Sequence, residues 1–276
     1  MHSTPPVEAF LTSFHDERPG LTSAAFGGLS VFFRGRQFPS SYEALASIVP
    51  PTHQDAHVLD IACGDGFLLS ILSRGRAHRL AGIDLSEGEI RRAAARLGGA
   101  ATLSLARAQS LPFADQTFDY AFCHLAMMLM NEADQVLREV HRVLKPGATL
   151  GAVVGARASA GPGLKAFIDI YSRYSRQPQF LELRFGDPRF RTAPGIQELL
   201  APLFRDVSID DLRISRRLTP DALWEWLLGM YDIYLLEETD RAAVHQQYLA
   251  AVVPICDADG TFPHEDALRL FCATAR

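Results

Sequence analysis

The segment AHVLDIACGDG at residues 56–66 constrains the fold more than any other part of this sequence. Its apolar run at 56–62 predicts a buried strand, and Gly64 and Gly66 predict a tight turn directly after it. The small residues Ala62, Gly64 and Gly66 allow the backbone to approach a ligand closely. A nucleotide-sized ligand is therefore expected at the end of this strand.

Strands and helices alternate along the next hundred residues. We expect helices at 67–75, closed by Gly75, and at 86–99, strands at 79–85, 101–108 and 118–126, a helix at 132–147 that Pro146 and Gly147 terminate, and a strand from residue 148. Each crossover between parallel strands places a helix on the sheet. The pattern predicts an α/β fold with a doubly wound, mostly parallel sheet and its ligand at the carboxyl ends of the strands.

The flanking regions are predicted to be mainly helical. We expect helices at 11–26, 40–49, 163–177 and 194–203, a strand at 206–215, a helical insertion at 219–253 and a last strand at 264–275. These elements divide the chain into an N-terminal helical cap segment at 1–55 and an α/β domain at 56–276, with helical insertions near 157–192 and 219–265.

Composition excludes several classes of function. A net charge of −5 over 276 residues offers no basic stripe for phosphate backbones, so nucleic acid is not an expected partner. No apolar run is long enough to span a bilayer, and the first twenty residues lack the pattern of a signal peptide. The four cysteines are scattered, which predicts neither a metal site nor a disulfide framework and favours the cytoplasm. The oligomeric state stays open.

An acid follows the second predicted strand. Asp84 comes 24 residues after Asp60, where a doubly wound fold places a carboxylate against a ribose diol. A glycine loop followed by such an acid suits both nicotinamide dinucleotides and S-adenosylmethionine. Leu69 stands where a pyrophosphate site needs its third glycine, so the sequence disfavours a dinucleotide.

Four segments of this chain, in order, resemble the motifs of class I S-adenosylmethionine-dependent methyltransferases. These segments are VLDIACGDG, GIDLS, AQSLPFADQTFDYAF and REVHRVLKPGATL. The resemblance covers about residues 56–155 and implies a Rossmann-like sheet of seven strands, the last one antiparallel, under a helical cap. It also implies S-adenosylmethionine as the cofactor.

The resemblance assigns site residues to each part of the cofactor. The methionine side receives Asp60, Ala62, Gly64 and Gly66, ribose and adenine receive Asp84 and Leu85, the adenine edge receives Ala108, Gln109 and Ser110, and His124 lies at the end of the fourth strand. Arg107 stands where many relatives have an acid, so backbone groups around Ala108 are expected to meet the adenine instead. In relatives the segment before the first motif folds over the cofactor, and Tyr42 is a better candidate than Arg34 or Arg36 to contact the cofactor carboxylate.

The expected reaction is methyl transfer to a small-molecule acceptor with an oxygen, nitrogen or carbon nucleophile. Transfer mainly requires alignment of the reacting groups, and His124 is the candidate base where a proton must leave. Two alternatives stay open at this point. The chain could cyclise or eliminate the aminobutyrate arm of the cofactor and release methylthioadenosine, or it could be a non-catalytic binding subunit.

Overall fold

The structure, a computed structural model, describes residues 6–74, 78–156, 161–175, 183 and 185–276. Contacts within the chain divide it into two compact units. Unit 1 comprises Met1–Arg157, Phe185–Leu212 and Leu268–Arg276, and unit 2 comprises Ala158–Arg184 and Arg213–Ala267. Gly75, expected to close a helix, lies outside the described residues.

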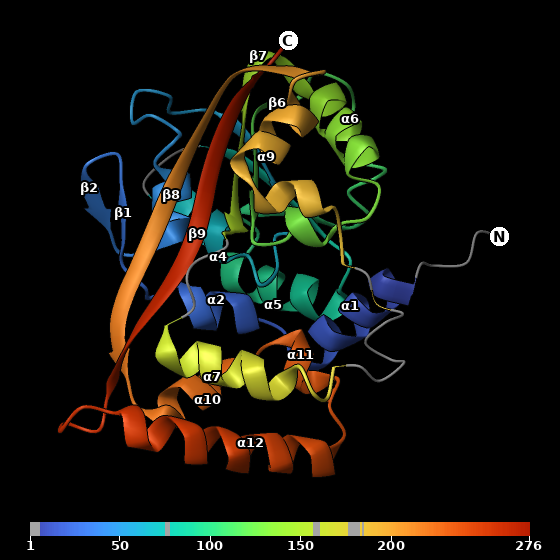
Figure 1. Cartoon of the computed structure of the whole chain (residues 1–276). Coiled ribbons are helices and arrows are strands. Elements are labelled where there is room, and N and C mark those ends of the chain that lie inside the picture. Colours follow the sequence, from blue (N-terminus) through green and yellow to red (C-terminus); the bar gives the residue numbers. More distant parts are fainter. Residues whose placement is uncertain (1–5, 75–77, 157–160, 176–182, 184) are drawn as a thin grey trace. The chain divides into compact units, whose positions relative to one another are not determined.

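The sheet has the doubly wound topology that the sequence predicted (Figure 1). Its seven strands follow the order β5-β4-β3-β6-β7-β9-β8. Their bounds are β3 His57–Ile61, β4 Arg79–Asp84, β5 Ala101–Leu105, β6 Phe118–His124, β7 Leu144–Gly155, β8 Phe204–Leu218 and β9 Phe262–Ala275. The strands β3 to β7 pair in parallel and β9 pairs antiparallel with β7, which confirms the expected antiparallel last strand.

The helices of unit 1 flank this sheet. Their bounds are α1 Pro6–Glu17, α2 Leu21–Phe26, α3 Ser41–Ala46, α4 Phe67–Leu72, α5 Glu87–Leu97, α6 Ala133–Val143 and α9 Ala193–Leu200, with short 3-10 turns η1 Met127–Leu129 and η2 Pro188–Arg191. The helix α5 has clear sequence signals at both of its ends. Ser86 Oγ accepts from Glu89 N–H and caps the first turn, and Gly98, at φ 54°, ends the helix.

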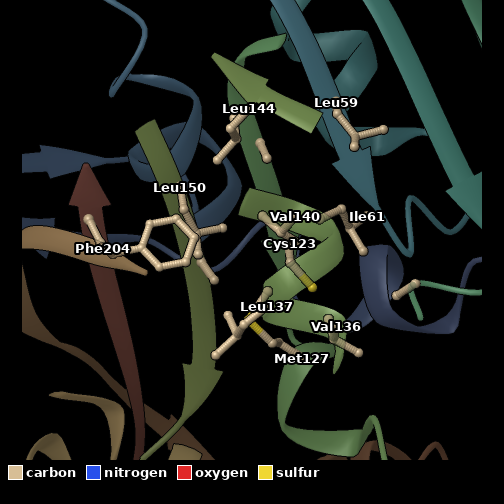
Figure 2. Packing of buried hydrophobic residues seen from close by; sticks show 14 of the residues in the cluster. Leu59, Ile61, Cys123, Met127, Val136, Leu137, Val140, Leu144, Leu150 and Phe204 are labelled. Atoms are coloured by element: carbon tan, nitrogen blue, oxygen red, sulfur yellow. The ribbon is translucent and has the colours of Figure 1, made fainter. Parts of the chain in front are cut away.

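A buried apolar cluster joins one face of the sheet to α6 and α9 (Figure 2). Leu59 and Ile61 of β3 and Cys123 of β6 meet α6 residues such as Val140. On the opposite face α4 packs closely against β4, where a Cβ on Gly82 would lie 2.9 Å from Leu69 Cδ1. Because both faces are covered there, the central strands β3 and β4 are almost continuously buried, whereas the edge strand β5 is only partly buried.

The predicted helix 132–147 is too long in its last turn. The helix α6 ends at Val143, and Leu144 already pairs with Phe118 as the first residue of β7. Leu144 is buried, so extending the chain there places an apolar side chain in the core and starts the strand four residues before the predicted position 148. Pro146 and Gly147 therefore lie inside β7 and do not terminate the helix.

The N-terminal region also departs from the predicted helices. The expected helix 11–26 is two helices, α1 and α2, because Gly20 at φ 84° breaks the chain direction between them. The residues after α2 form a hairpin of β1 Val31–Phe33 and β2 Arg36–Phe38, which the sequence prediction missed.

Unit 2 is a helical cluster with its own core. It contains α7 Pro162–Tyr171, α10 Pro220–Leu227, α11 Tyr231–Tyr234, α12 Glu238–Val252, the turn η3 Val253–Ile255 and the parts of β8 and β9 within Arg213–Ala267. The helices α7, α10 and α12 contact one another, and Trp224 and Tyr248 are among the buried residues that fill the core. No helix among the described residues is long and apolar enough to cross a membrane.

Candidate functional site

The predicted site residues gather at one edge of the sheet in unit 1. The parallel strands β3, β4, β5 and β6 all end there, which brings together side chains and turns that are far apart in sequence. Asp60, Asp84 and His124 lie in the last two positions of their strands, Ala62, Gly64 and Gly66 in the β3–α4 turn, Leu85 directly after β4, Ala108, Gln109 and Ser110 after β5, and Tyr42 in α3.

The β3–α4 turn is held in an unusual backbone conformation. Ala62 (φ 56°), Gly64 (φ 52°) and Gly66 (φ 76°) all lie in the left-handed region. A Cβ on Gly66 would lie 3.0 Å from Leu97 Cδ1 and 3.1 Å from Ala93 Cβ, so α5 packs directly on the turn. The tight turn thus directs the Gly64 N–H toward the end of β4.

The Asp84 carboxylate is fixed through both of its oxygens. Gly64 N–H donates to Oδ2 and Ser86 N–H donates to Oδ1, each at 2.9 Å. Burial raises the pKa of Asp84, while these two backbone amides act in the opposite direction and favour the ionised form. Each oxygen keeps a further lone pair, so the carboxylate can accept hydrogen bonds from two vicinal hydroxyl groups.

Asp60 is a buried acid without a partner among the described residues. Its exposed fraction is 2%, and its carboxylate forms no hydrogen bond or ion pair with any residue that the structure describes. Burial raises its pKa well above the ordinary value, and the negative charges of Asp84 and Asp65 add to that rise. A cationic ligand group at this edge would supply the missing counter-charge.

The helix α1 contributes an acid that the sequence analysis missed. Glu8 is 5% exposed and accepts from Arg107 Nε at 2.8 Å and from Arg107 Nη2 at 2.7 Å. Gln109 Nε2 donates to Glu8 Oε1 at 3.1 Å and to Asn131 O at 3.0 Å. These bonds use both amide hydrogens of Gln109 and leave its Oε1 as the acceptor atom at the predicted adenine edge.

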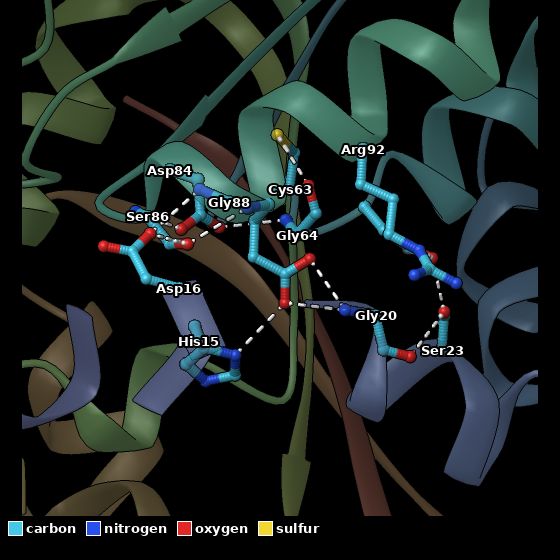
Figure 3. A network of polar contacts seen from close by, with 12 residues as sticks. His15, Asp16, Gly20, Ser23, Cys63, Gly64, Asp84, Ser86, Gly88 and Arg92 are labelled. Atoms are coloured by element: carbon cyan, nitrogen blue, oxygen red, sulfur yellow. Dashed lines mark hydrogen bonds and ion pairs between the residues drawn. The ribbon is translucent and has the colours of Figure 1, made fainter. Parts of the chain in front are cut away.

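A second set of contacts ties the start of the chain to α5 (Figure 3). Asp16 Oδ1 accepts from Ser86 Oγ at 2.7 Å and from Gly88 N–H at 2.8 Å, and these bonds lower the pKa of Asp16. The Glu89 carboxylate accepts from Gly20 N–H at 3.0 and 2.9 Å and lies 3.1 Å from His15 Nδ1. The N-terminal segment is therefore anchored beside Asp84.

His124 and Tyr42 form a buried stack. Their ring centroids are 3.5 Å apart at an interplanar angle of 19°, and Ser41 Oγ lies 2.9 Å from His124 Nε2. Burial lowers the pKa of His124 to about 3 and raises that of Tyr42 well above its usual value. Both rings are neutral at ordinary pH, and the role of His124 as a base stays a prediction.

Arg34 and Arg36, the other candidates for a contact with the cofactor carboxylate, have partners elsewhere. Arg34 donates to Ser208 Oγ at 3.0 Å and to Asp210, and Arg36 covers the ring of Phe38. The aromatic residues Tyr171, Tyr174, Trp224, Trp226 and Tyr231 belong to unit 2. The described residues contain no group of three or more His, Cys, Asp or Glu placed to hold a metal ion.

Comparison with known proteins agrees with this geometry. Residues 59–151 match the profile of a family described as a methyltransferase domain. A demethylmenaquinone methyltransferase of Symbiobacterium thermophilum is 39% identical over 98 residues, which cover 33% of this chain and 39% of that protein. The O-methyltransferase resE of Aspergillus sclerotiorum is 29% identical over 167 residues, which cover 58% of this chain and 59% of that protein. Both matches span less than two thirds of the relative.

A solved structure shares the fold. Phosphoethanolamine N-methyltransferase 2 of Haemonchus contortus, in complex with phosphomonomethylethanolamine and S-adenosylhomocysteine, superposes with a TM-score of 0.59 at 17% identity. The alignment covers 100% of this chain and 60% of that one. At this identity the likeness establishes the architecture of the chain.

Proposed function

Since residues 59–151 form a class I S-adenosylmethionine-dependent methyltransferase domain, we propose that the protein transfers a methyl group to a small-molecule acceptor. The observation that carries this proposal is the unpartnered carboxylate of Asp60 beside the fixed carboxylate of Asp84. S-adenosylmethionine carries an ammonium and a sulfonium group, so it brings positive charge to an edge that has an excess of negative charge.

The residues present fit the cofactor in each of its parts. Asp60 and the β3–α4 turn would hold the methionine side, and Asp84 would accept from the two ribose hydroxyls. Gln109 Oε1 would accept from the adenine amino group, since Glu8 and Asn131 already occupy its amide hydrogens. When bound, the cofactor supplies a methyl carbon activated by a positive sulfur.

The protein itself would then orient the cofactor and the acceptor and exclude water from the reacting groups. A buried site with fixed carboxylates holds the donor in one geometry, and alignment alone lowers the barrier of such a transfer substantially. His124 would act on the acceptor side as a neutral hydrogen-bonding group fixed by Ser41. The named relatives, a demethylmenaquinone methyltransferase and an O-methyltransferase, support a small organic acceptor with an oxygen, nitrogen or carbon nucleophile.

Calorimetry with S-adenosylhomocysteine tests the cofactor half. We expect binding to the wild-type protein and affinity weakened by more than about tenfold in Asp84→Ala, since a charged acceptor is lost. Asp119→Ala is the matched control, because Asp119 lies at the amino end of β6 and pairs with Lys145. Equal affinity of Asp84→Ala and wild type would remove Asp84 from the site.

Product analysis tests the reaction. Incubation of the isolated chain with S-adenosylmethionine and candidate acceptors should yield S-adenosylhomocysteine in proportion to methylated product. Release of methylthioadenosine would instead show cleavage of the aminobutyrate arm. Cofactor binding without turnover on any acceptor would indicate a binding subunit.

A further inference from the structure

The start of α5 joins two carboxylates that come from distant parts of the chain (Figure 3). Asp84 is the last residue of β4, and Asp16 is the last residue but one of α1. Ser86 N–H donates to Asp84 Oδ1 at 2.9 Å, and Gly88 N–H donates to Asp16 Oδ1 at 2.8 Å. The acid of the proposed ribose site and an acid of the N-terminal helix are therefore held by the same turn.

Ser86 connects the two carboxylates directly. Besides its N–H bond to Asp84, Ser86 donates from Oγ to Asp16 Oδ1 at 2.7 Å. The same Oγ accepts from Glu89 N–H at 3.0 Å. A serine hydroxyl has a single proton, so its donation to Asp16 leaves the lone pairs of the oxygen to Glu89 N–H. Asp16 thereby fixes the side chain of the residue whose backbone amide holds Asp84.

The backbone of α1 also packs directly on α5 at Gly88. A Cβ on Gly88 would lie 2.9 Å from Asp16 O and 3.0 Å from Asp16 Cα. A residue without a side chain is therefore needed for the end of α1 to come this close. The position of Asp16 beside Ser86 depends on this backbone contact as well as on the two hydrogen bonds.

Asp16 is an exposed residue, whereas Ser86 is buried. The bond from Gly88 N–H holds the pKa of Asp16 below its usual range, and the bond from Ser86 adds to this effect. Asp16 is therefore ionised at neutral pH, and a carboxylate accepts from a hydroxyl more strongly than a neutral group does. Its negative charge is also favourable at the amino end of a helix. The contribution of Asp16 is thus to the geometry of this turn and not to the packing of the core.

We propose that Asp16 is a positioning residue for the recognition of ribose. It fixes Ser86, and Ser86 in turn holds the Asp84 carboxylate in the orientation that receives the two vicinal hydroxyls of the cofactor. Gly64 N–H occupies the other oxygen of Asp84, so rotation of the carboxylate would break a bond on either side. The inference rests on the proposed function, and it gives the N-terminal helix a part in selecting the ribose of the cofactor.

The test compares the binding of S-adenosylhomocysteine with that of its 2′-deoxy analogue by calorimetry. Wild type should bind S-adenosylhomocysteine at least about tenfold more tightly, as expected for a hydroxyl that donates to a carboxylate. Asp16→Ala should lower this ratio of affinities to about threefold or less, because a misoriented Asp84 loses its advantage for the hydroxyl. A purely structural role of Asp16 would weaken both ligands alike. An unchanged ratio in Asp16→Ala would overturn the inference.

Three further variants locate the effect. Asp16→Asn keeps an oxygen that can accept from Ser86 and Gly88, so it should restore most of the ratio. Gly88→Ala keeps the side chains of Asp16 and Ser86 but pushes the end of α1 away, so it should lower the ratio as Asp16→Ala does, although alanine favours a helix. Glu8→Gln is the control, since it loosens α1 at Arg107 and should weaken both ligands while the ratio stays near that of wild type.

A double-mutant cycle separates positioning from a direct contact between Asp16 and the ribose. Asp84→Ala should bring the ratio close to one, and Asp16→Ala should then change it by less than about twofold, because no carboxylate remains to be oriented. If Asp84→Ala instead keeps a ratio above about threefold and Asp16→Ala removes it, Asp16 contacts the hydroxyl itself and the positioning role is rejected.

Failure of this inference and failure of the proposed function give different results. If wild type does not bind S-adenosylhomocysteine, the proposed function is contradicted. If it binds and shows a ratio that Asp84→Ala lowers but Asp16→Ala does not, this inference alone fails. A wild-type ratio near one also overturns the inference, while formation of methylated product decides the proposed function separately. Near-UV circular dichroism verifies that each variant is folded, and Gly88→Ala keeps the test decisive if Asp16→Ala is not.

Discussion

Glu8 accepts two hydrogen bonds from the guanidinium of Arg107, at 2.7 and 2.8 Å, and so joins α1 to the segment that follows β5. The same carboxylate accepts from the side-chain amide of Gln109. One residue near the start of the chain therefore both fastens α1 to the sheet edge and orients a predicted adenine contact.

Glu8→Gln should weaken both stability and cofactor binding. The substitution places an amide donor beside Arg107 and Gln109, so we expect the free energy of unfolding to fall by about 1–3 kcal/mol. Affinity for S-adenosylhomocysteine should fall severalfold, because Gln109 loses the bond that sets its orientation. Urea unfolding and calorimetry measure the two effects.

Glu87→Gln provides the control for that experiment. Glu87 pairs with Arg91 on the exposed surface of α5, where both side chains are about two thirds exposed or more. Such a pair contributes about 0.3–0.5 kcal/mol. Losses of the same size in Glu8→Gln and Glu87→Gln would show that the Glu8 contact does not anchor α1.

Gly66→Ala should lower the free energy of unfolding by more than backbone strain at a positive φ alone explains. Gly66 has φ 76°, and its added Cβ would meet Leu97 and Ala93 of α5 at 3.0 and 3.1 Å. Gly35 has nearly the same φ, 75°, with nothing within 4 Å of its added Cβ. We expect Gly35→Ala to cost about 1–2 kcal/mol from backbone strain, and Gly66→Ala about 1–3 kcal/mol more from overpacking.

Thermal unfolding of the two alanine variants compares them at equal strain. Gly66→Ala should also bind S-adenosylhomocysteine more weakly than Gly35→Ala does, because the β3–α4 turn carries the Gly64 N–H that orients Asp84. Equal unfolding temperatures of the two variants would contradict the close packing of α5 on this turn.

The sheet edge was predictable from sequence because its signals are local. The apolar run 56–62 and the glycines after it depend on only a few neighbouring residues. These patterns predicted correctly that Asp60, Gly64 and Asp84 lie at the carboxyl ends of β3 and β4. The pairing of Glu8 with Arg107 joins positions 99 residues apart. Arg107 stands out only as a departure from the motif, and nothing near it in the sequence indicates Glu8 as its partner.

Two departures from the predicted fold have different physical origins. Leu144 ends α6 early because strand pairing with Phe118 and burial outweigh helix propensity, a competition that only the tertiary structure decides. The hairpin β1–β2, by contrast, has a local signal in the sequence. Arg34 and Gly35, both at positive φ, form its two-residue connection between short aromatic-rich segments.

Asp60→Asn should stabilise the protein at neutral pH while weakening cofactor binding. The pKa of Asp60 in the folded state is raised, so the folded protein loses stability as the pH rises from the ordinary carboxyl value through that raised value. Asparagine removes this cost, so the Tm at pH 7 should increase by about 2 °C or more. Near pH 3, where the wild-type carboxyl is protonated in both states, the difference should vanish.

Asp119→Asn should have the opposite effect and lower the Tm at neutral pH. Burial tends to raise the pKa of Asp119, but bonds from Lys145 and from His57 N–H hold it below its usual value. The ionised carboxylate of Asp119 therefore stabilises the folded protein above the ordinary carboxyl pKa, and this stabilisation is lost as the pH falls through the lowered pKa of Asp119. A Tm series from pH 3 to 8 compares both variants, and a lower Tm of Asp60→Asn at pH 7 would refute the unpartnered carboxylate.

His124→Ala should slow methyl transfer about tenfold with little change in affinity for S-adenosylhomocysteine. The imidazole is buried, its pKa is lowered to about 3, and Ser41 already contacts Nε2. In the proposed function, a ring that stays neutral from pH 5 to 8 would act on the acceptor through hydrogen bonding, held in place by packing against Tyr42. Steady-state kinetics and the ring chemical shifts of His124 across that pH range check both parts.

His124→Gln separates positioning from proton removal. Glutamine can reproduce the contact with Ser41, so a positioning role predicts a rate within about threefold of wild type, whereas loss of a general base costs about 10²–10⁴-fold. Ser41→Ala should slow turnover as much as His124→Ala if the pair acts together. If His124 ionises between pH 5 and 8 and this ionisation matches the pH profile of kcat, His124 acts as a general base and the positioning role is rejected.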